Sequence, residues 1–271
     1  MTRVVERPAG AGLLLRVVPP GLYAGRARVL VERAYLVNRR AWLSLVSGFF
    51  EPVFFLLSLG YGFGQLVSAV DGVPYPAYVA PALLAASAMN GAIFDATYNL
   101  FFKIKYARLY EAVLATPMGP VDIAVGEACW ALLRGGLYSA GFLAVMLGFG
   151  LVWSPWAVLV LPACLLVALA FAAVGMAATT FMRSWQDFDL VQLLVLPLFL
   201  FSTTFYPLSV YPAWLRAVVQ WTPLYHAIEL TRALTTGHVG WGLLGHVGYF
   251  AVMAALGVAV AARRLGRLLT A

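Results

Sequence analysis

The sequence has few charged side chains. Asp, Glu, Lys and Arg make up 11% of its 271 residues, whereas hydrophobic residues make up 63%. Soluble globular chains carry about 25% charged residues, so this share is too small to cover a surface that faces water. The shortage excludes a soluble enzyme, a disordered chain and a secreted disulfide scaffold. The two cysteines, Cys129 and Cys164, lie in apolar runs, where we expect them to pack as small apolar side chains.

Patterns for catalysis or metal binding are also missing. The only lysines, Lys103 and Lys105, do not follow a glycine, so the phosphate-binding pattern GxxxxGK[ST] is absent. The three histidines lack the HExxH spacing, the cysteines are far from any histidine in the sequence, and there is no GxSxG elbow. We therefore expect this chain to carry no catalytic residue, to hold no metal and to bind no cofactor itself.

Long apolar runs are abundant instead. Six stretches reach the roughly 20 mostly apolar residues that a membrane-spanning helix needs: residues 41–66, 78–102, 128–153, 156–182, 188–206 and 241–262. The runs are continuous rather than alternating, which excludes a β-barrel. The sequence therefore predicts an all-α polytopic membrane protein, with a transmembrane domain over residues 41–262 between tails at 1–40 and 263–271.

The basic residues are placed unevenly along the chain. Fifteen of the 18 Lys and Arg residues precede the first span, follow the second or fourth, or follow the sixth. Because basic loops stay on the cytoplasmic side, we predict that both termini are cytoplasmic. The first forty residues contain eight arginines and no pattern of a cleavable signal peptide.

An amphipathic helix is predicted over residues 22–40, ahead of the first span. Apolar side chains recur there at helical spacing, which is typical of a helix that lies in the membrane interface. The predicted apolar face consists of Tyr23, Ala27, Leu30, Ala34 and Val37. Lipid anchoring alone accounts for this pattern, and contact with a cytoplasmic partner is the alternative. Its polar face carries Arg28, Glu32 and Arg39, and Arg26, Arg33 and Arg40 flank that face.

The longest cytoplasmic loop, residues 103–127, contains a second short helix. Residues 109–115 are good helix formers, and Pro117 stops the helix because proline disfavours helical geometry in the residue before it. A short, partly apolar helix suits docking into a groove of another protein; a plain turn between two spans is the alternative. The residues expected at such a contact are Leu109, Tyr110, Glu111, Val113, Leu114, Thr116 and Pro117.

Four charged residues lie inside or at the edge of the predicted spans: Glu51, Asp95, Glu127 and Arg134. Charges in a membrane are costly and usually face protein or a cavity. Asp95 and Arg134 lie about 12 and 13 Å from the cytoplasmic ends of consecutive antiparallel spans, so we predict an ion pair between them. Its expected role is to hold spans two and three together, and the alternative is a polar lining of a transport path.

Residues 204–240, on the predicted outer side, are expected to form two short helices. The first has Pro212 in its first turn, and the second covers residues 224–234. If they dip back into the membrane, they have to be helical or buried in protein, because unpaired backbone is not tolerated against lipid. The residues singled out there are Trp214, Trp221, His226, Glu229 and Arg232.

Several motifs, taken in order, resemble the permease subunits of the ABC-2 exporter family. Residues 95–98 (DATY), 110–117 (YEAVLATP) and 126–127 (GE) are most similar to the nodulation lipo-oligosaccharide and daunorubicin-resistance permeases. Further matches are residues 51–64 (EPVFFLLSLGYGFG), 205–207 (FYP) and 222–225 (TPLY). The resemblance covers residues 20–262, and its one departure is Asp95, where the pattern has glutamate.

The resemblance implies a permease subunit of an ATP-driven exporter in the bacterial cytoplasmic (inner) membrane. Its substrate would be an amphiphile: a lipid, a lipid-linked saccharide or a hydrophobic drug. It also implies a dimer with a second copy or a paralogous permease, and a separate ATP-binding subunit that holds the ATP and Mg²⁺. No nucleic-acid partner is expected.

The resemblance also assigns roles to segments of this chain. Residues 22–40 become a connecting helix, residues 109–115 a coupling helix that docks on the ATP-binding subunit, and residues 204–234 outer re-entrant helices. Spans two and five would line the path, with Met89, Asn90, Phe94, Phe199, Thr203 and Thr204 as candidates. Two other functions stay open: a membrane enzyme acting on lipid-linked substrates, and a passive channel.

Overall fold

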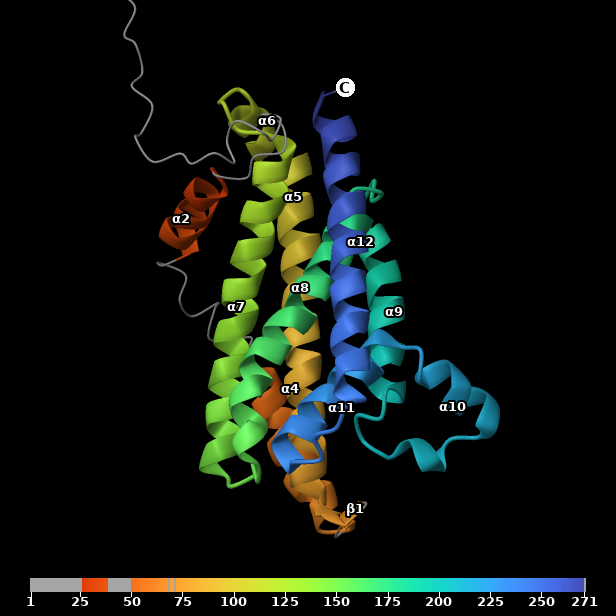
Figure 1. Ribbon diagram of the computed structural model, residues 1–271. Helices are drawn as coiled ribbons and strands as arrows, with labels where there is room; N and C mark the ends of the chain where they lie inside the picture. Colours follow the sequence, from red (N-terminus) through yellow and green to blue (C-terminus); the bar gives the residue numbers. More distant parts are fainter. Residues whose placement is uncertain (1–25, 39–49, 68, 71, 271) are drawn as a thin grey trace, which may run out of the picture.

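Long apolar helices run side by side along the molecule (Figure 1). The computed structural model describes residues 26–38, 50–67, 69–70 and 72–270. Four of its helices are long and apolar enough to cross a membrane: Tyr75–Lys105, Val121–Gly148, Pro155–Thr179 and Gly242–Leu265. They correspond to the second, third, fourth and sixth predicted spans, which makes the chain a multi-pass membrane protein.

The first and fifth predicted spans are represented by shorter helices. The described part of residues 41–66 is an apolar helix over Phe50–Phe63, whose second half is the π-helix η2 (Leu56–Phe63); residues 41–49 lie outside the described residues. The helix α9 (Asp187–Phe201) has 15 residues. A helix of that length reaches about 22 Å, less than the ~30 Å of hydrocarbon. The helix α9 ends before Thr203, whose φ of +63° lies outside the right-handed helical region.

The second span is the central column of the bundle. It consists of α4 (Tyr75–Phe94), the π-helical turn η3 (Asp95–Asn99) and α5 (Leu100–Lys105). It is the most buried of the four long helices, and its run of alanines lets neighbouring helices approach closely. A two-stranded hairpin, β1 (Ala69–Val70) and β2 (Val73–Pro74), precedes it.

The remaining spans pack around this column. The helix α7 (Pro120–Gly148) is followed by η4 (Pro155–Leu159) and α8 (Val160–Thr179), and α12 (Leu243–Thr270) lies along α8. The contact between α8 and α12 is close: a Cβ added at Gly257 would lie 2.7 Å from the backbone carbon of Ala173. Small side chains therefore set the helix spacing there.

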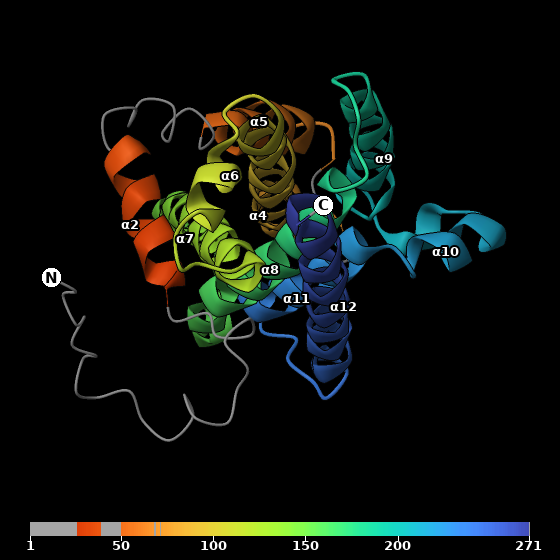
Figure 2. The ribbon, with the colours of Figure 1, turned by 90° about the horizontal axis from the view of Figure 1, so that it is seen from above.

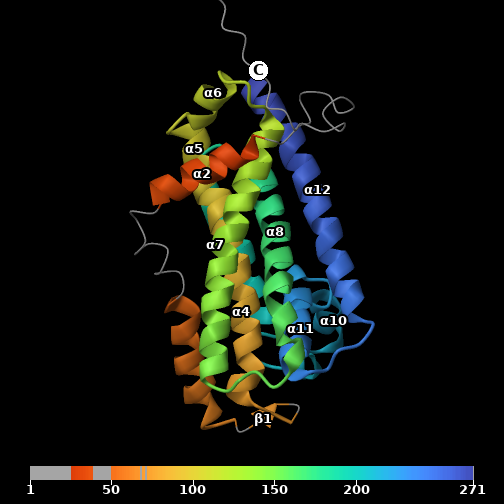
Figure 3. The ribbon, with the colours of Figure 1, turned by 60° about the vertical axis from the view of Figure 1, so that its left-hand side comes forward.

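The two ends of the bundle carry different short helices (Figures 1 and 3). One end, here called the α6 end, carries α6 (Leu109–Leu114) and the last turns of α12. The opposite end, the α11 end, carries the β hairpin and the helices η5 (Leu208–Val210), α10 (Ala213–Val219) and α11 (Pro223–Thr236).

Two helices flank the bundle. Figure 2 shows α9 and α10 at one edge and α2 (Ala27–Asn38) at the opposite edge. The amphipathic helix predicted over residues 22–40 is confirmed for this described part; Arg39 and residues 22–25 lie outside it. The two short helices predicted within residues 204–240 are confirmed as α10 and α11.

Replacing Gly257 with alanine tests the close approach of α8 and α12. The added methyl group meets backbone that cannot yield, so we expect a loss of about 1–3 kcal/mol of stability. Gly248 lies on the same helix with nothing within 4 Å of an added Cβ, and Gly248→Ala should be neutral or stabilising. Thermal unfolding of both variants in detergent measures the difference, and equal melting temperatures would contradict the packing described.

Candidate functional site

A buried ion pair joins the second and third spans. Arg134 Nη1 on α7 donates a hydrogen bond to Asp95 Oδ1 at 2.7 Å, and the two side chains are 13% and 4% exposed. Arg134 Nη2 donates to the hydroxyl of Tyr138 at 3.1 Å, and the amide of Asn99 donates to the same Asp95 oxygen. The contact predicted from matching depths is therefore present.

The π-helical turn η3 forms the local setting of Asp95. Such turns interrupt the regular hydrogen bonds of an α-helix and are frequent at functional sites. Thr179 on α8 donates its hydroxyl to the carbonyl oxygen of Ala96 at 2.8 Å, so a neighbouring span bonds the backbone of this turn. Both flanking spans thus fix the position of the Asp95 carboxylate.

A cavity of about 390 Å³ lies beside the ion pair. The helix Phe50–Phe63, the central column, α7 and α9 all contribute to its walls. The lining is mixed: charged or amide side chains come from Glu51, Asn90, Arg134 and Gln192, and aromatic rings from Phe55, Phe94, Tyr98, Tyr138 and Phe199. A cavity of this size, mostly apolar with a few polar groups, is typical of a small-molecule site.

Only half of the predicted path residues line this cavity. Asn90, Phe94 and Phe199 do. Met89 instead is fully buried in the helical core, because consecutive residues of a helix point about 100° apart. Thr203 and Thr204 are buried at the α11 end.

Several lining residues were not among the candidates from the sequence, including Tyr98 and Gln192. Tyr98 continues the helical row of Asn90 and Phe94, four residues apart, and that spacing was the signal for it. Gln192 is the one amide in the apolar run of α9. Glu51 and Arg134, predicted as intramembrane charges, also face the cavity.

A second polar cluster anchors α6 to the bundle. Glu127 on α7 binds Lys103 Nζ at 2.6 Å and accepts a hydrogen bond from the Tyr110 hydroxyl at 2.7 Å. Burial, and then the negative charge of Glu127, raises the pKa of Tyr110 well above its usual value. Tyr110 therefore stays protonated and keeps donating, which ties α6 to both neighbouring spans.

The predicted helix over residues 109–115 is confirmed as α6, but its exposed face is narrower than predicted. Tyr110 is buried, and Leu109, Val113 and Leu114 pack partly against the bundle core. Of the predicted contact residues, Glu111, Thr116 and Pro117 are exposed, together with Ala112 and Ala115 between them. The apolar side chains of so short a helix are used to hold it in place.

The helix α2 packs on α7 beside α6. A Cβ on Gly126 would lie 2.9 Å from Leu30 Cβ, so α7 needs a glycine at this contact. The backbone N–H of Arg26 donates to Asp122 Oδ1 at 3.2 Å, and its guanidinium donates to the carbonyl of Pro117. Ala27 and Leu30 are buried, whereas Val37 of the predicted apolar face is 61% exposed.

The predicted polar face of α2 is exposed as well. Arg28 and Glu32 form an ion pair at 2.7 Å with both side chains largely exposed, and Arg33 is also exposed. Because Arg26 bonds to Pro117, α2 and the segment after α6 are joined at the same end of the molecule.

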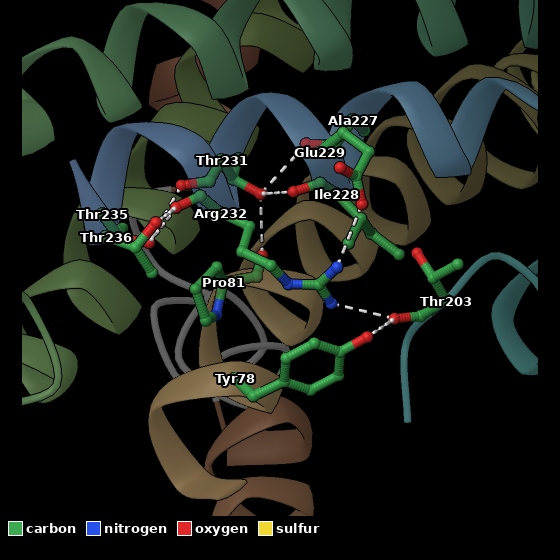
Figure 4. A network of polar contacts seen from close by, with 10 residues as sticks. All are labelled: Tyr78, Pro81, Thr203, Ala227, Ile228, Glu229, Thr231, Arg232, Thr235 and Thr236. Carbon is green, nitrogen blue, oxygen red and sulfur yellow. Dashed lines mark hydrogen bonds and ion pairs between the residues drawn. The ribbon is translucent and has the colours of Figure 1, made fainter. Parts of the chain in front are cut away.

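Arg232 on α11 connects three segments at the α11 end (Figure 4). Its guanidinium lies 3.9 Å from the ring centre of Tyr78 on α4, and Nη2 donates to the carbonyl of Thr203 at 2.9 Å. Nη1 donates to Glu229 at 3.1 Å. Thr203 has a positive φ, which is rare for a β-branched residue. These bonds hold Thr203 in that conformation.

The other predicted residues of the α11 end differ in exposure. Trp214 and Trp221 are 70% and 79% exposed. His226 Nδ1 lies 2.6 Å from His246 Nδ1, and burial lowers the pKa of His226. Within the described ranges, no three His, Cys, Asp or Glu side chains are grouped as metal ligands. Half of the residues of α11 are buried and the others are half-buried, and the helix packs against α4, α8 and α12.

Comparison with known proteins identifies the family. Residues 26–236 match the family described as ABC-2 type transporter. The chain belongs to this family. It is an ABC-2 permease, a membrane transport subunit that is not itself catalytic.

Relatives of this ABC-2 permease are similar over most of their length. Nodulation protein J of Rhizobium leguminosarum bv. trifolii is 34% identical over 87% of this chain and 92% of its own length. Nodulation protein J of Rhizobium meliloti (strain 1021) is 32% identical over 86% and 92%. That of Bradyrhizobium diazoefficiens is 30% identical over 93% and 97%.

Neutralising one partner of the ion pair tests its role in this permease. Asp95→Asn leaves Arg134 buried without a counter-ion, which should cost about 3–5 kcal/mol, whereas Asp95→Glu keeps the charge and should retain most of the stability. Arg134→Gln leaves Asp95 unpaired and should resemble Asp95→Asn. Thermal unfolding and size-exclusion chromatography measure these effects. Normal stability and assembly of both neutral variants would show that the pair is dispensable.

Proposed function

We propose that the chain is the permease subunit of an ATP-driven exporter. It moves an amphiphilic substrate, such as a lipid, a lipid-linked saccharide or a hydrophobic drug, out across the bacterial cytoplasmic membrane. The observation that carries the proposal is the cavity between the helix Phe50–Phe63, α4, α7 and α9, in a chain of the ABC-2 family. Aromatic walls with a few polar groups favour an amphiphile over a hydrated ion.

The charge distribution supports an orientation. Lys103, Lys105 and Arg108 lie beside α6, and Arg263, Arg264 and Arg267 lie in the last turns of α12. Since basic residues stay on the cytoplasmic side, the α6 end is the cytoplasmic end and the α11 end faces outward. In this proposal the helix Phe50–Phe63 belongs to the first span and α9 to the fifth, which makes six spans with both termini cytoplasmic.

A separate ATP-binding subunit supplies the energy in this proposal. It binds the ATP and Mg²⁺, and it docks on the exposed side of α6, formed by Glu111, Ala112, Ala115, Thr116 and Pro117. The helix α2 bonds to the same segment through Arg26 and is the second element that this subunit moves. The permease partner is a second copy or a paralogue.

The contacts of α6 give a route from the docking face to the cavity. Tyr110 binds Glu127, and Arg134 follows Glu127 by seven residues on α7. Seven residues are nearly two helical turns, so both side chains lie on one face about 10 Å apart. Movement of α6 therefore shifts α7 and with it the cavity wall that contains Arg134. Alternating access follows if that shift opens the cavity to one side at a time.

A charge on the exposed face of α6 tests the docking role. Ala112→Arg places a cation at the proposed contact without disturbing the half-buried Val113 and Leu114. We expect at least a tenfold loss of the ATPase activity that co-purifies with the chain, because an unpaired charge at an interface costs several kcal/mol.

The matched control is Val239→Arg, an equal change at an exposed position of the opposite end. It should leave the co-purifying ATPase activity unchanged. The proposal is wrong if Ala112→Arg retains full activity, or if the unmodified chain purifies from its native membrane without any ATPase.

A further inference from the structure

Two charged side chains line the cavity, Arg134 and Glu51, and only Arg134 has a counter-ion among the described residues. Arg134 is neutralised by Asp95 at 2.7 Å. Glu51 also lines the cavity, and within the described part of the chain its carboxylate forms no ion pair. Among the described residues, no other Asp, Glu, Lys, Arg or His lines the cavity. One negative charge is therefore left over in a site at membrane depth, where an unpaired charge is costly.

Two lining residues also offer unused hydrogen-bonding atoms. Asn90 Oδ1 and Arg134 Nε are buried and have no partner among the described residues. Buried polar atoms are nearly always paired in folded proteins. Because Asn90 and Arg134 line the cavity, a ligand there can pair these atoms once the side chains turn toward it. Asn90 Oδ1 accepts a hydrogen bond from an N–H group, whereas Arg134 Nε donates one to an oxygen.

Aromatic rings complete the lining. Phe94 stacks on Tyr98 with ring centres 4.9 Å apart, and Phe55 meets Phe199 edge to face at 5.6 Å. Aromatic faces attract cations within about 6 Å and also cover apolar groups. The walls thus combine one surplus carboxylate, an orphan acceptor and aromatic surface, which together match an organic cation.

We propose that the cavity binds the ammonium group of a cationic amphiphile, with Glu51 as its counter-ion and Asn90 as its hydrogen-bond acceptor. An oxygen near that ammonium group receives the hydrogen bond of Arg134 Nε. The inference narrows the substrate class of the exporter proposed above and rests on that function. Glu51 is exposed in the single chain, so it stands where a ligand enters from the membrane.

Binding of a fluorescent organic cation tests the inference. The purified chain is placed in phosphatidylcholine nanodiscs, and the fluorescence anisotropy of rhodamine 6G is titrated against empty nanodiscs. Dodecylamine should displace the dye, whereas dodecanol, with the same chain and no charge, should not. Glu51→Gln should weaken dye binding by about tenfold or more, because hydrogen bonds to charged groups are the strong ones.

Asp189→Asn is the matched control, since it removes an exposed carboxylate of α9 that does not line the cavity. It should bind rhodamine 6G like the unmodified chain. Gln192→Glu adds a carboxylate to the cavity wall and should tighten binding, a gain that misfolding cannot produce.

The inference is overturned if Glu51→Gln and Gln192→Glu both bind the dye like the unmodified chain, or if dodecanol competes as well as dodecylamine. The titration needs no ATP-binding subunit. If the chain co-purifies with an ATPase but does not prefer the cation, only the proposed ligand class is wrong. If the chain binds the cation selectively but no ATPase co-purifies with it, the exporter function is wrong.

Discussion

A charge inside a membrane has to be paired. The arrangement of the helices in this permease follows from how its buried charges are paired. Asp95 and Arg134 are brought together by a π-helical turn in the central column and by the facing side of α7. Because the pair is buried between two spans, it fixes their relative depth and rotation. The cavity opens directly beside it, so one interaction both holds the bundle and forms part of the proposed binding wall.

Polar contacts at the two ends extend this constraint. At the α6 end, Glu127 ties α6 to α5 and α7, and at the α11 end Arg232 ties α4 to α11 and to the turn at Thr203. Both clusters connect short helices to long ones. In the proposed function, the ATP-binding subunit moves α6 and so acts on the Glu127 cluster. The Arg232 cluster holds the strained turn after α9 at the outer end.

Hydropathy and helix geometry predicted the helical class, the short helices α6, α10 and α11, and the contact of Asp95 with Arg134. These features depend on composition and regular spacing, which a sequence displays directly. The sequence did not show that Val113 and Leu114 pack against their own bundle, or that Met89 points away from the cavity while Asn90 lines it. Such details depend on which face of a helix its neighbours cover. Gln192 joins the site only because α9 lies beside the central column, a long-range contact with no local signature.

In the proposed mechanism, an ATP-binding subunit that moves α6 changes the cavity between α7 and α9. Spin labels at the exposed positions Leu133 on α7 and Leu193 on α9, in a chain with Cys129 and Cys164 replaced by alanine, report that distance by pulsed electron resonance. The account predicts a different distance distribution when the complex with its ATP-binding subunit receives ATP and Mg²⁺ than when it is nucleotide-free. Identical distributions in a complex that hydrolyses ATP would contradict it.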